Sequence, residues 1–158
     1  MDSAVDVVGF APDEVTLGES TRSARLKWVI VVDPAIPAGR MANAVACIAA
    51  GMGEAVANLI GPAALDAAGQ PHPGLPWAGC TILAADPVTL AEIRARAVAA
   101  DGFYVADMPE IAQTVRVYDD YVAQLAETKP EDLAVYAVGI IGPRNRVAKL
   151  VKRLELLP

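Results

Sequence analysis

The sequence is poor in the residues that usually build reactive or metal-binding sites, with one histidine and two cysteines in 158 residues. Cys47 and Cys80 lie in apolar surroundings without a CxxC or His-Cys spacing, so we expect two buried thiols, no disulfide and no metal site. Ser3, Ser20 and Ser23 are the only serines, and their position near the N-terminus makes a Ser-His-Asp triad hard to assemble. Neither a P-loop nor a GxGxxG after a strand is present, so we expect no cofactor.

The sequence also lacks a long apolar run and a basic N-terminal segment. No unbroken apolar stretch reaches the roughly 18 residues that indicate a transmembrane helix. The chain begins with Met1-Asp2-Ser3, whereas a secretory signal has basic residues followed by an apolar run. We therefore expect a cytoplasmic protein that does not enter a membrane.

Basic residues are scarce at the start of the chain and frequent at its end. The net charge is −6 and the pI is about 4.7. Because nucleic-acid binding depends largely on neutralising phosphates, nucleic acid is not an expected partner. The C-terminal basic cluster consists of Arg144, Arg146, Lys149, Lys152 and Arg153. We favour a solvated helix face over a binding patch for this cluster.

Apolar runs and amphipathic segments alternate along most of the chain. The stretch Leu-Lys-Trp-Val-Ile-Val-Val at 26–32 is nearly continuously apolar, which is typical of a strand covered on both faces. Expected strands lie at 26–32, 80–85, 103–106 and 133–141, and expected helices begin near residues 39, 87, 109 and 145. This βαβαβαβα order predicts a single α/β domain at 21–158 with a central sheet. Residues 1–20 have no sustained period and are predicted to form an N-terminal arm.

The predicted helices differ in how they would pack. The first, at about 39–59, is rich in alanine, and we interpret these small side chains as permitting close approach to the sheet or to a partner helix. Asp86-Pro87 provides an N-cap and a first-turn proline for the second. The third is expected to be one helix up to 129, packed by Ile111, Val115, Tyr118, Val122 and Leu125. Asn145 is expected to cap the last.

The segment 61–79 is rich in glycine and proline and is predicted to be a loop with a helical turn at 63–68. It contains His72, the single histidine, between two prolines. Two interpretations remain open: a surface turn residue, which we favour, or a general acid or base.

The first strand–helix junction carries the candidate ligand site. Arg40, Asn43 and Cys47 share one face of the predicted helix, and they occur near its N-terminus, where anions are stabilised. The functional interpretation is an anion pocket with Asp107 opposite. The structural alternative is an ion pair of Arg40 with Asp33 or Asp107, with Asn43 bonded to a loop backbone. The two interpretations are nearly balanced.

Several stretches in order resemble one bacterial family. They are RLKWVIVVDPAIPAGRMANAVACIAAG, GQPHPGL, TVRVYDDY and GIIGPRNRVAKLVKRLELLP. Over about 21–158 the chain resembles the domain of unknown function 2000 family and, more remotely, the type 2 peptidyl-tRNA hydrolases. The resemblance implies a four-stranded mixed sheet with helices on both faces, often in a dimer. The alanine-rich helix and the high apolar content also suggest a surface that another chain covers, so we expect a homodimer.

Only part of the hydrolase site is kept. Asp33, Gly39 and Asp107 match the family's acidic and glycine positions. The positions that differ are Arg40 for a lysine, Ala44 for a glutamine, Cys47 for a histidine and Ile111 for a threonine. A guanidinium stays charged and cannot act as a lysine of lowered pKa, but it can hold a carboxylate or phosphate through two hydrogen bonds.

These observations give three functional hypotheses. The first is binding of a small anionic ligand at the junction formed by Asp33, Gly39, Arg40, Asn43 and Cys47. Hydrolysis of that ligand, with Arg40, Asp107 and His72 as candidate catalytic residues, is left open. The alternative is a non-catalytic dimeric interaction module. A peptidyl-tRNA hydrolase is the least favoured.

Because the lysine, glutamine, histidine and threonine positions are all changed, we predict that the purified protein turns over peptidyl-tRNA not at all or very weakly. The measurement is release of free tRNA from a peptidyl-tRNA substrate. Robust turnover would contradict the prediction.

Overall fold

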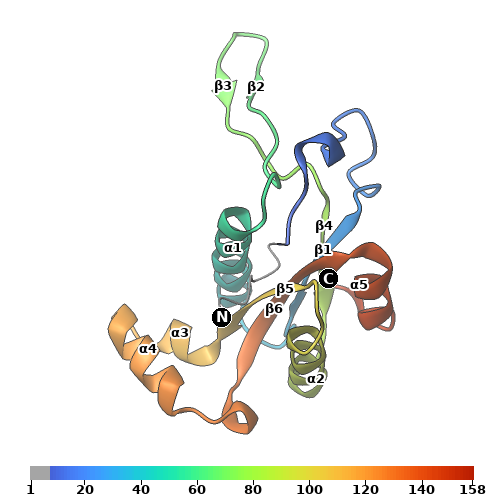
Figure 1. Ribbon diagram of the computed structural model, residues 1–158. Coiled ribbons are helices and arrows are strands. Elements are labelled where there is room, and N and C mark those ends of the chain that lie inside the picture. Colours follow the sequence, from blue (N-terminus) through green and yellow to red (C-terminus); the bar gives the residue numbers. More distant parts are fainter. Residues whose placement is uncertain (1–7) are drawn as a thin grey trace, which may run out of the picture.

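Five strands form a mixed sheet of order β5-β6-β1-β4-β7 in the computed structural model, which describes residues 8–158 (Figure 1). A separate two-stranded hairpin consists of β2 and β3. The strands are β1 (Leu26–Val32), β2 (Ala64–Leu65), β3 (Pro71–His72), β4 (Cys80–Ala84), β5 (Tyr104–Pro109), β6 (Val135–Pro143) and β7 (Glu155–Leu156). The α-helices are α1 (Ala38–Ala55), α2 (Pro87–Val98), α3 (Glu110–Thr114), α4 (Tyr118–Glu127) and α5 (Arg144–Leu150). Short 3₁₀ helices span Pro12–Glu14 and Pro130–Asp132.

The predicted sheet is confirmed as mixed, but it has five strands rather than four. β1 runs parallel to β4 and antiparallel to β6. The additional strand, β7, is only two residues long and pairs with the edge of β4. A two-residue strand has no detectable period, so only its position beside β4 defines it.

Helices cover both faces of the sheet, as the apolar run of β1 predicts. Trp28, Ile30 and Val32 belong to the core on the α1 side. Val29 and Val31 belong to the core against α2 and α5. This alternation along β1 is the period of a strand, with both of its faces buried.

The close approach of α1 to the sheet depends on a glycine of β6. A Cβ built at Gly139 would overlap Ile48 Cγ2 and lie 3.0 Å from Met52 Cε. Of the alanines credited with this approach, only Ala44 belongs to the buried stripe with Ile48 and Met52. The other four, Ala42, Ala46, Ala49 and Ala50, are exposed or half-buried. The interpretation of the alanine run as a sheet contact was therefore wrong for these four, and their close approach to a partner helix stays a prediction.

The segment predicted as one long third helix is two helices. Val115 has an extended backbone with φ −99° and ψ 153°, which ends α3. No residue of α4 is buried, and Tyr118 is 76% exposed. The predicted packing stripe fails because α3 and α4 lie beyond the end of β5 rather than over the sheet (Figure 1).

Other local predictions also need correction. Residues 63–68 contain strand β2 instead of a helical turn, and Asp66 Oδ1 accepts hydrogen bonds from Ala68 N and Gln70 N to form the hairpin turn. Asn145 lies inside α5, because β6 runs directly into that helix through Pro143. The first helix ends at Ala55 rather than near residue 59.

Both cysteines are exposed, which corrects the prediction of buried thiols. Desolvation by neighbouring atoms nevertheless raises the pKa of the Cys80 thiol to about 12. Cys80 therefore remains protonated near neutral pH and is a poor nucleophile.

The described part of the N-terminal arm is packed on the domain; its first seven residues lie outside the described residues. Phe10 is 2% exposed, and its ring centroid lies 4.6 Å from that of Trp77. Glu14 forms an ion pair with Arg25. Within residues 8–158, no helix has the length and hydropathy needed to cross a membrane.

We predict that Gly139→Ala lowers the free energy of unfolding by about 1–3 kcal/mol, the usual cost of overpacking a core. Gly51→Ala is the matched control, because a Cβ at Gly51 of α1 would meet no atom within 4 Å. In a helix that control should stabilise by roughly 0.5–1 kcal/mol. Urea unfolding of both variants measures the difference, and equal stability of the two would contradict the role given to Gly139.

Candidate ligand-binding site

The β1–α1 junction begins with Asp33, a buried acid that shapes the loop. Its side chain is 7% exposed, and Oδ1 accepts a hydrogen bond of 2.9 Å from Ala35 N. Its backbone N–H donates to the carbonyl oxygen of Tyr136 on β6. These bonds fix the direction in which the chain leaves β1 and enters α1.

Arg40 lies in the first turn of α1 and is exposed. Its Nη1 donates a hydrogen bond of 3.1 Å to the hydroxyl of Tyr136. No carboxylate in residues 8–158 lies within 4.0 Å of its guanidinium nitrogens. The predicted ion pairs with Asp33 or Asp107 are therefore wrong, and most of the guanidinium donors have no acceptor among residues 8–158.

Tyr136 reaches Arg40 because of a β-bulge. Met108 pairs with Ala137 and Pro109 pairs with Val135, so Tyr136 is the extra residue on β6. Pro109 has no N–H to donate, which interrupts regular pairing at this point. A bulge redirects the extra side chain, and Tyr136 packs against the core on the α1 side.

Gln113 of α3 joins the site and was not found from the sequence. Its Nε2 donates to the carbonyl oxygen of Arg40 at 2.9 Å and to Asn43 Oδ1 at 3.1 Å. The expected bond from Asn43 to a loop backbone is thus replaced by a side-chain contact. Gln113 Oε1 is buried and accepts no hydrogen bond within the described part of the chain. The sequence feature that could have identified Gln113 is its amide side chain in the mainly apolar start of the third predicted helix.

Asp107 lies on the opposite face of the sheet from Arg40. It pairs in register with Val138, which faces the α2–α5 core, and its carboxylate forms an ion pair with Arg94 of α2. Its neighbour Met108 faces the α1 side instead. Because successive strand side chains point to opposite faces, the structure does not bring Asp107 to Arg40.

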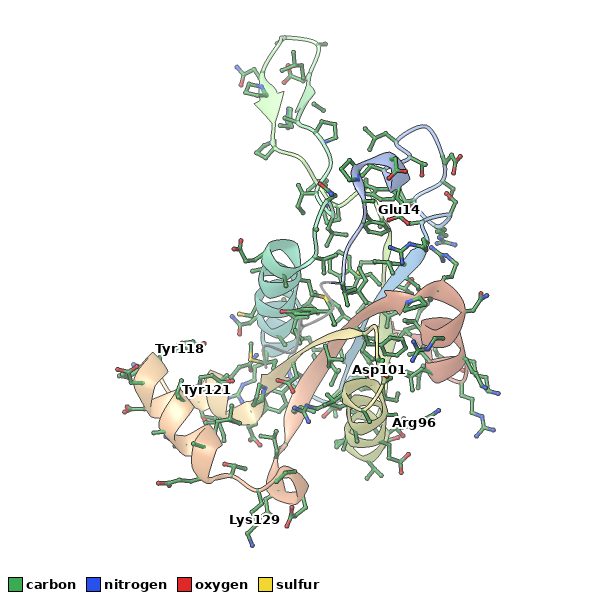
Figure 2. The ribbon with its side chains drawn as sticks, viewed as in Figure 1. Glu14, Arg96, Asp101, Tyr118, Tyr121 and Lys129 are labelled. Carbon is green, nitrogen blue, oxygen red and sulfur yellow. The ribbon has the colours of Figure 1, made fainter. Side chains whose placement is uncertain are left out.

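The charge of Asp107 also affects the pKa of Tyr121 on α4. Burial is the main cause that raises the pKa of Tyr121, followed by the negative charge of Asp107 and by Tyr118. Figure 2 shows Tyr118 and Tyr121 together on α4, where their rings make an edge contact with centroids 5.5 Å apart.

The other predicted site residues have fewer contacts. A Cβ at Gly39 would meet no atom within 4 Å, so space remains beside Arg40. Cys47 is exposed further along α1. His72 is exposed on β3, with Nε2 3.4 Å from Asp66 Oδ2. The hairpin that carries it projects beyond the far end of α1 (Figure 1), which supports its interpretation as a surface turn residue.

The junction therefore offers hydrogen-bond donors rather than acid–base pairs. Residues 8–158 contain no group of histidine, cysteine and acidic side chains able to hold a metal ion. The side chains that the structure brings together are Arg40, Asn43, Gln113 and Tyr136, from α1, α3 and β6.

These features describe a mixed α/β domain with a polar strand–helix junction, at which residues 8–158 bring no acid–base pair together. The chain belongs to the family described as protein of unknown function DUF2000, whose profile matches residues 26–158. The fold is similar to that of a solved structure, the protein of unknown function Atu0240 from Agrobacterium tumefaciens strain C58. The TM-score is 0.78 at 18% sequence identity, covering 84% of this chain and 97% of that one. No curated protein matches the chain.

We predict that Asp107→Asn lowers the free energy of unfolding by about 1–2 kcal/mol, because it removes a partly buried ion pair with Arg94. It should also lower the pKa of Tyr121, since the charge of Asp107 helps to raise it. Urea unfolding and pH titration of the Tyr121 ring signal measure the two effects.

Asp101→Asn, a substitution of an exposed acid, is the control for that experiment and should change neither quantity. A ligand that binds more weakly to Asp107→Asn but equally well to Arg40→Ala would show that Asp107 serves a binding site of its own.

Proposed function

We propose that this protein binds a small anionic ligand, bearing a carboxylate or a phosphate, at the β1–α1 junction. The observation that carries the proposal is Arg40, whose guanidinium is positioned by the hydroxyl of Tyr136 and has no carboxylate partner within the described chain. A guanidinium in this state can bind an anion through two parallel hydrogen bonds.

The start of α1 adds to the attraction for an anion. In the part of the chain that the structure describes, no side chain caps this 18-residue helix, and its first turn contains no acidic residue. Uncapped N–H groups and the helix dipole both favour negative charge at this end. Gln113 stabilises the same turn, because its Nε2 donates hydrogen bonds to Arg40 O and to Asn43 Oδ1.

Binding is better supported than hydrolysis. Asp107 is engaged by Arg94 on the other face, and His72 is on the projecting hairpin. Neither candidate acid or base is close to Arg40, and general acid–base catalysis requires a group within hydrogen-bond reach of the reacting atom. We also propose that the fold is distantly related to that of the type 2 peptidyl-tRNA hydrolases. The proposal does not extend to their hydrolase activity.

We predict that Arg40→Ala weakens ligand binding by about 1.5–3 kcal/mol, the range for hydrogen bonds to charged groups. Arg40→Lys should recover binding only in part, because it restores the charge without the planar fork. A thermal-shift screen of phosphates, carboxylates and nucleotides identifies a ligand, and calorimetry then measures its affinity for each variant.

The control for Arg40→Ala is Arg22→Ala, which removes an exposed arginine whose guanidinium forms no ion pair among residues 8–158. It should bind like the unaltered protein. An Arg40→Ala variant that is strongly destabilised and yet binds every ligand normally would refute the proposal.

A second candidate function is a homodimeric interaction module. It is favoured by an apolar groove of about 650 Å³ between α1 and the C-terminal segment. The side chains of residues 8–158 that line the groove are all uncharged: Ala38, Met41, Ala42, Val45, Ala46, Ile82, Leu157 and Pro158. A surface of this kind gains stability when a second copy excludes water from it.

We predict a dimer mass in light scattering at tens of micromolar and a monomer mass for Ala46→Arg, which places a charge in the groove. Ala95→Arg is the matched control, because Ala95 is an exposed alanine of α2 on the other face of the sheet. A monomer mass for the unaltered protein would exclude this function.

A further inference from the structure

A second cleft lies on the face of the sheet opposite α1, between α2, the end of α5 and β7. Its volume is about 780 Å³, within the range of roughly 300–1,000 Å³ usual for small-molecule sites. Pro34 and Ala85, which follow the parallel strands β1 and β4, contribute to its wall. Ligands of open α/β sheets commonly bind at this carboxyl edge.

Four basic side chains converge on this cleft. Arg96 comes from α2, Lys149 from the last turn of α5, and Lys152 and Arg153 from the turn that follows. Figure 2 shows Arg96 on α2. None of the four forms an ion pair with any residue of the described chain. The attraction for an anion is therefore not neutralised by direct contacts.

The acidic residues of the cleft offset part of this cluster and leave an excess of one positive charge in the lining. Asp86 caps α2, and its carboxylate accepts hydrogen bonds from Thr89 N at 3.0 Å and Thr89 Oγ1 at 2.9 Å. Glu92 and Glu155 are exposed and form no ion pair in residues 8–158. The lining thus has four basic and three acidic side chains, in a protein with a net charge of −6.

The cleft combines these charges with apolar surface. Ile93 is 4% exposed, and Leu150 and Leu154 are half-buried beside it. A cluster of lysines after α5 would by itself be explained by solvation and by the helix dipole. That explanation does not account for Arg96 on a different helix or for the apolar surface between them.

We propose that this cleft binds a small organic phosphate of nucleotide size, with its phosphate groups among Arg96, Lys149, Lys152 and Arg153 and its less polar part against Ile93, Leu150 and Leu154. Several cations favour a ligand with more than one negative charge. The site is on the other face of the sheet from Arg40 and does not depend on the proposed function of that residue.

Calorimetric titration of the whole protein tests the site with three probes. Adenosine 5′-diphosphate carries both charge and a ring system, pyrophosphate carries the charge alone, and adenosine carries the ring system alone. The first should bind most tightly. The double variant Lys152→Ala/Arg153→Ala should weaken its binding by at least about tenfold, and Arg96→Ala should act in the same direction from the other helix.

The matched control is Arg22→Ala/Lys129→Ala, which removes the same charge at exposed positions outside the cleft and should leave the affinity within about twofold. Urea melts of each variant check that it is folded, and the charge-conserving Lys152→Arg/Arg153→Lys should retain binding.

The possible results separate this site from the Arg40 site. Loss of binding in the cleft variants, with Arg40→Ala and the control unaffected, supports the proposal. Loss in Arg40→Ala alone overturns it and favours the β1–α1 junction. Equal loss in the control, or no binding of either phosphate probe at millimolar concentration, also overturns it.

Discussion

The packing of α1 on β6 depends on Gly139, because any side chain there would overlap Ile48. This contact fixes α1 over the centre of the sheet, where β1 is buried on both faces. The buried carboxylate of Asp33 then directs the short loop from β1 into α1. The position of Arg40 follows from these constraints, and the bulge at Tyr136 supplies the hydroxyl that holds it.

The carboxyl edge of the sheet presents two different surfaces, one for each face. On the α1 side, a single arginine is surrounded by amide and hydroxyl groups. On the α2–α5 side, a larger cleft combines four basic groups with apolar side chains. Asp107 belongs to the second face, where Arg94 neutralises it. The sheet therefore separates Asp107 from Arg40, which the anion-pocket interpretation had placed opposite each other.

Residues with a clear local period were predictable. The run at 26–32 defined β1, and Asp86-Pro87 defined the start of α2, since capping is a local interaction. The split between α3 and α4, the β2–β3 hairpin and strand β7 were not predictable. Their sequences fit more than one local structure. Pairing with β4 defines β7, whereas the β2–β3 hairpin is closed by the turn at Asp66. At the site, Arg40 and Asn43 were predicted from helical spacing, whereas Gln113 and Tyr136 were missed.

The sequence by itself determined the α/β class and the order of the main elements, because hydrophobic period and capping act over a few residues. It also determined that an arginine lies near the N-terminus of the first helix. Only the tertiary structure decided which polar groups share a site. The face to which a strand residue points depends on register, and the bulge in β6 changes the face that Tyr136 occupies. For the same reason, Asp107 pairs with Arg94 from α2 and leaves Arg40 without an acidic partner in the described chain.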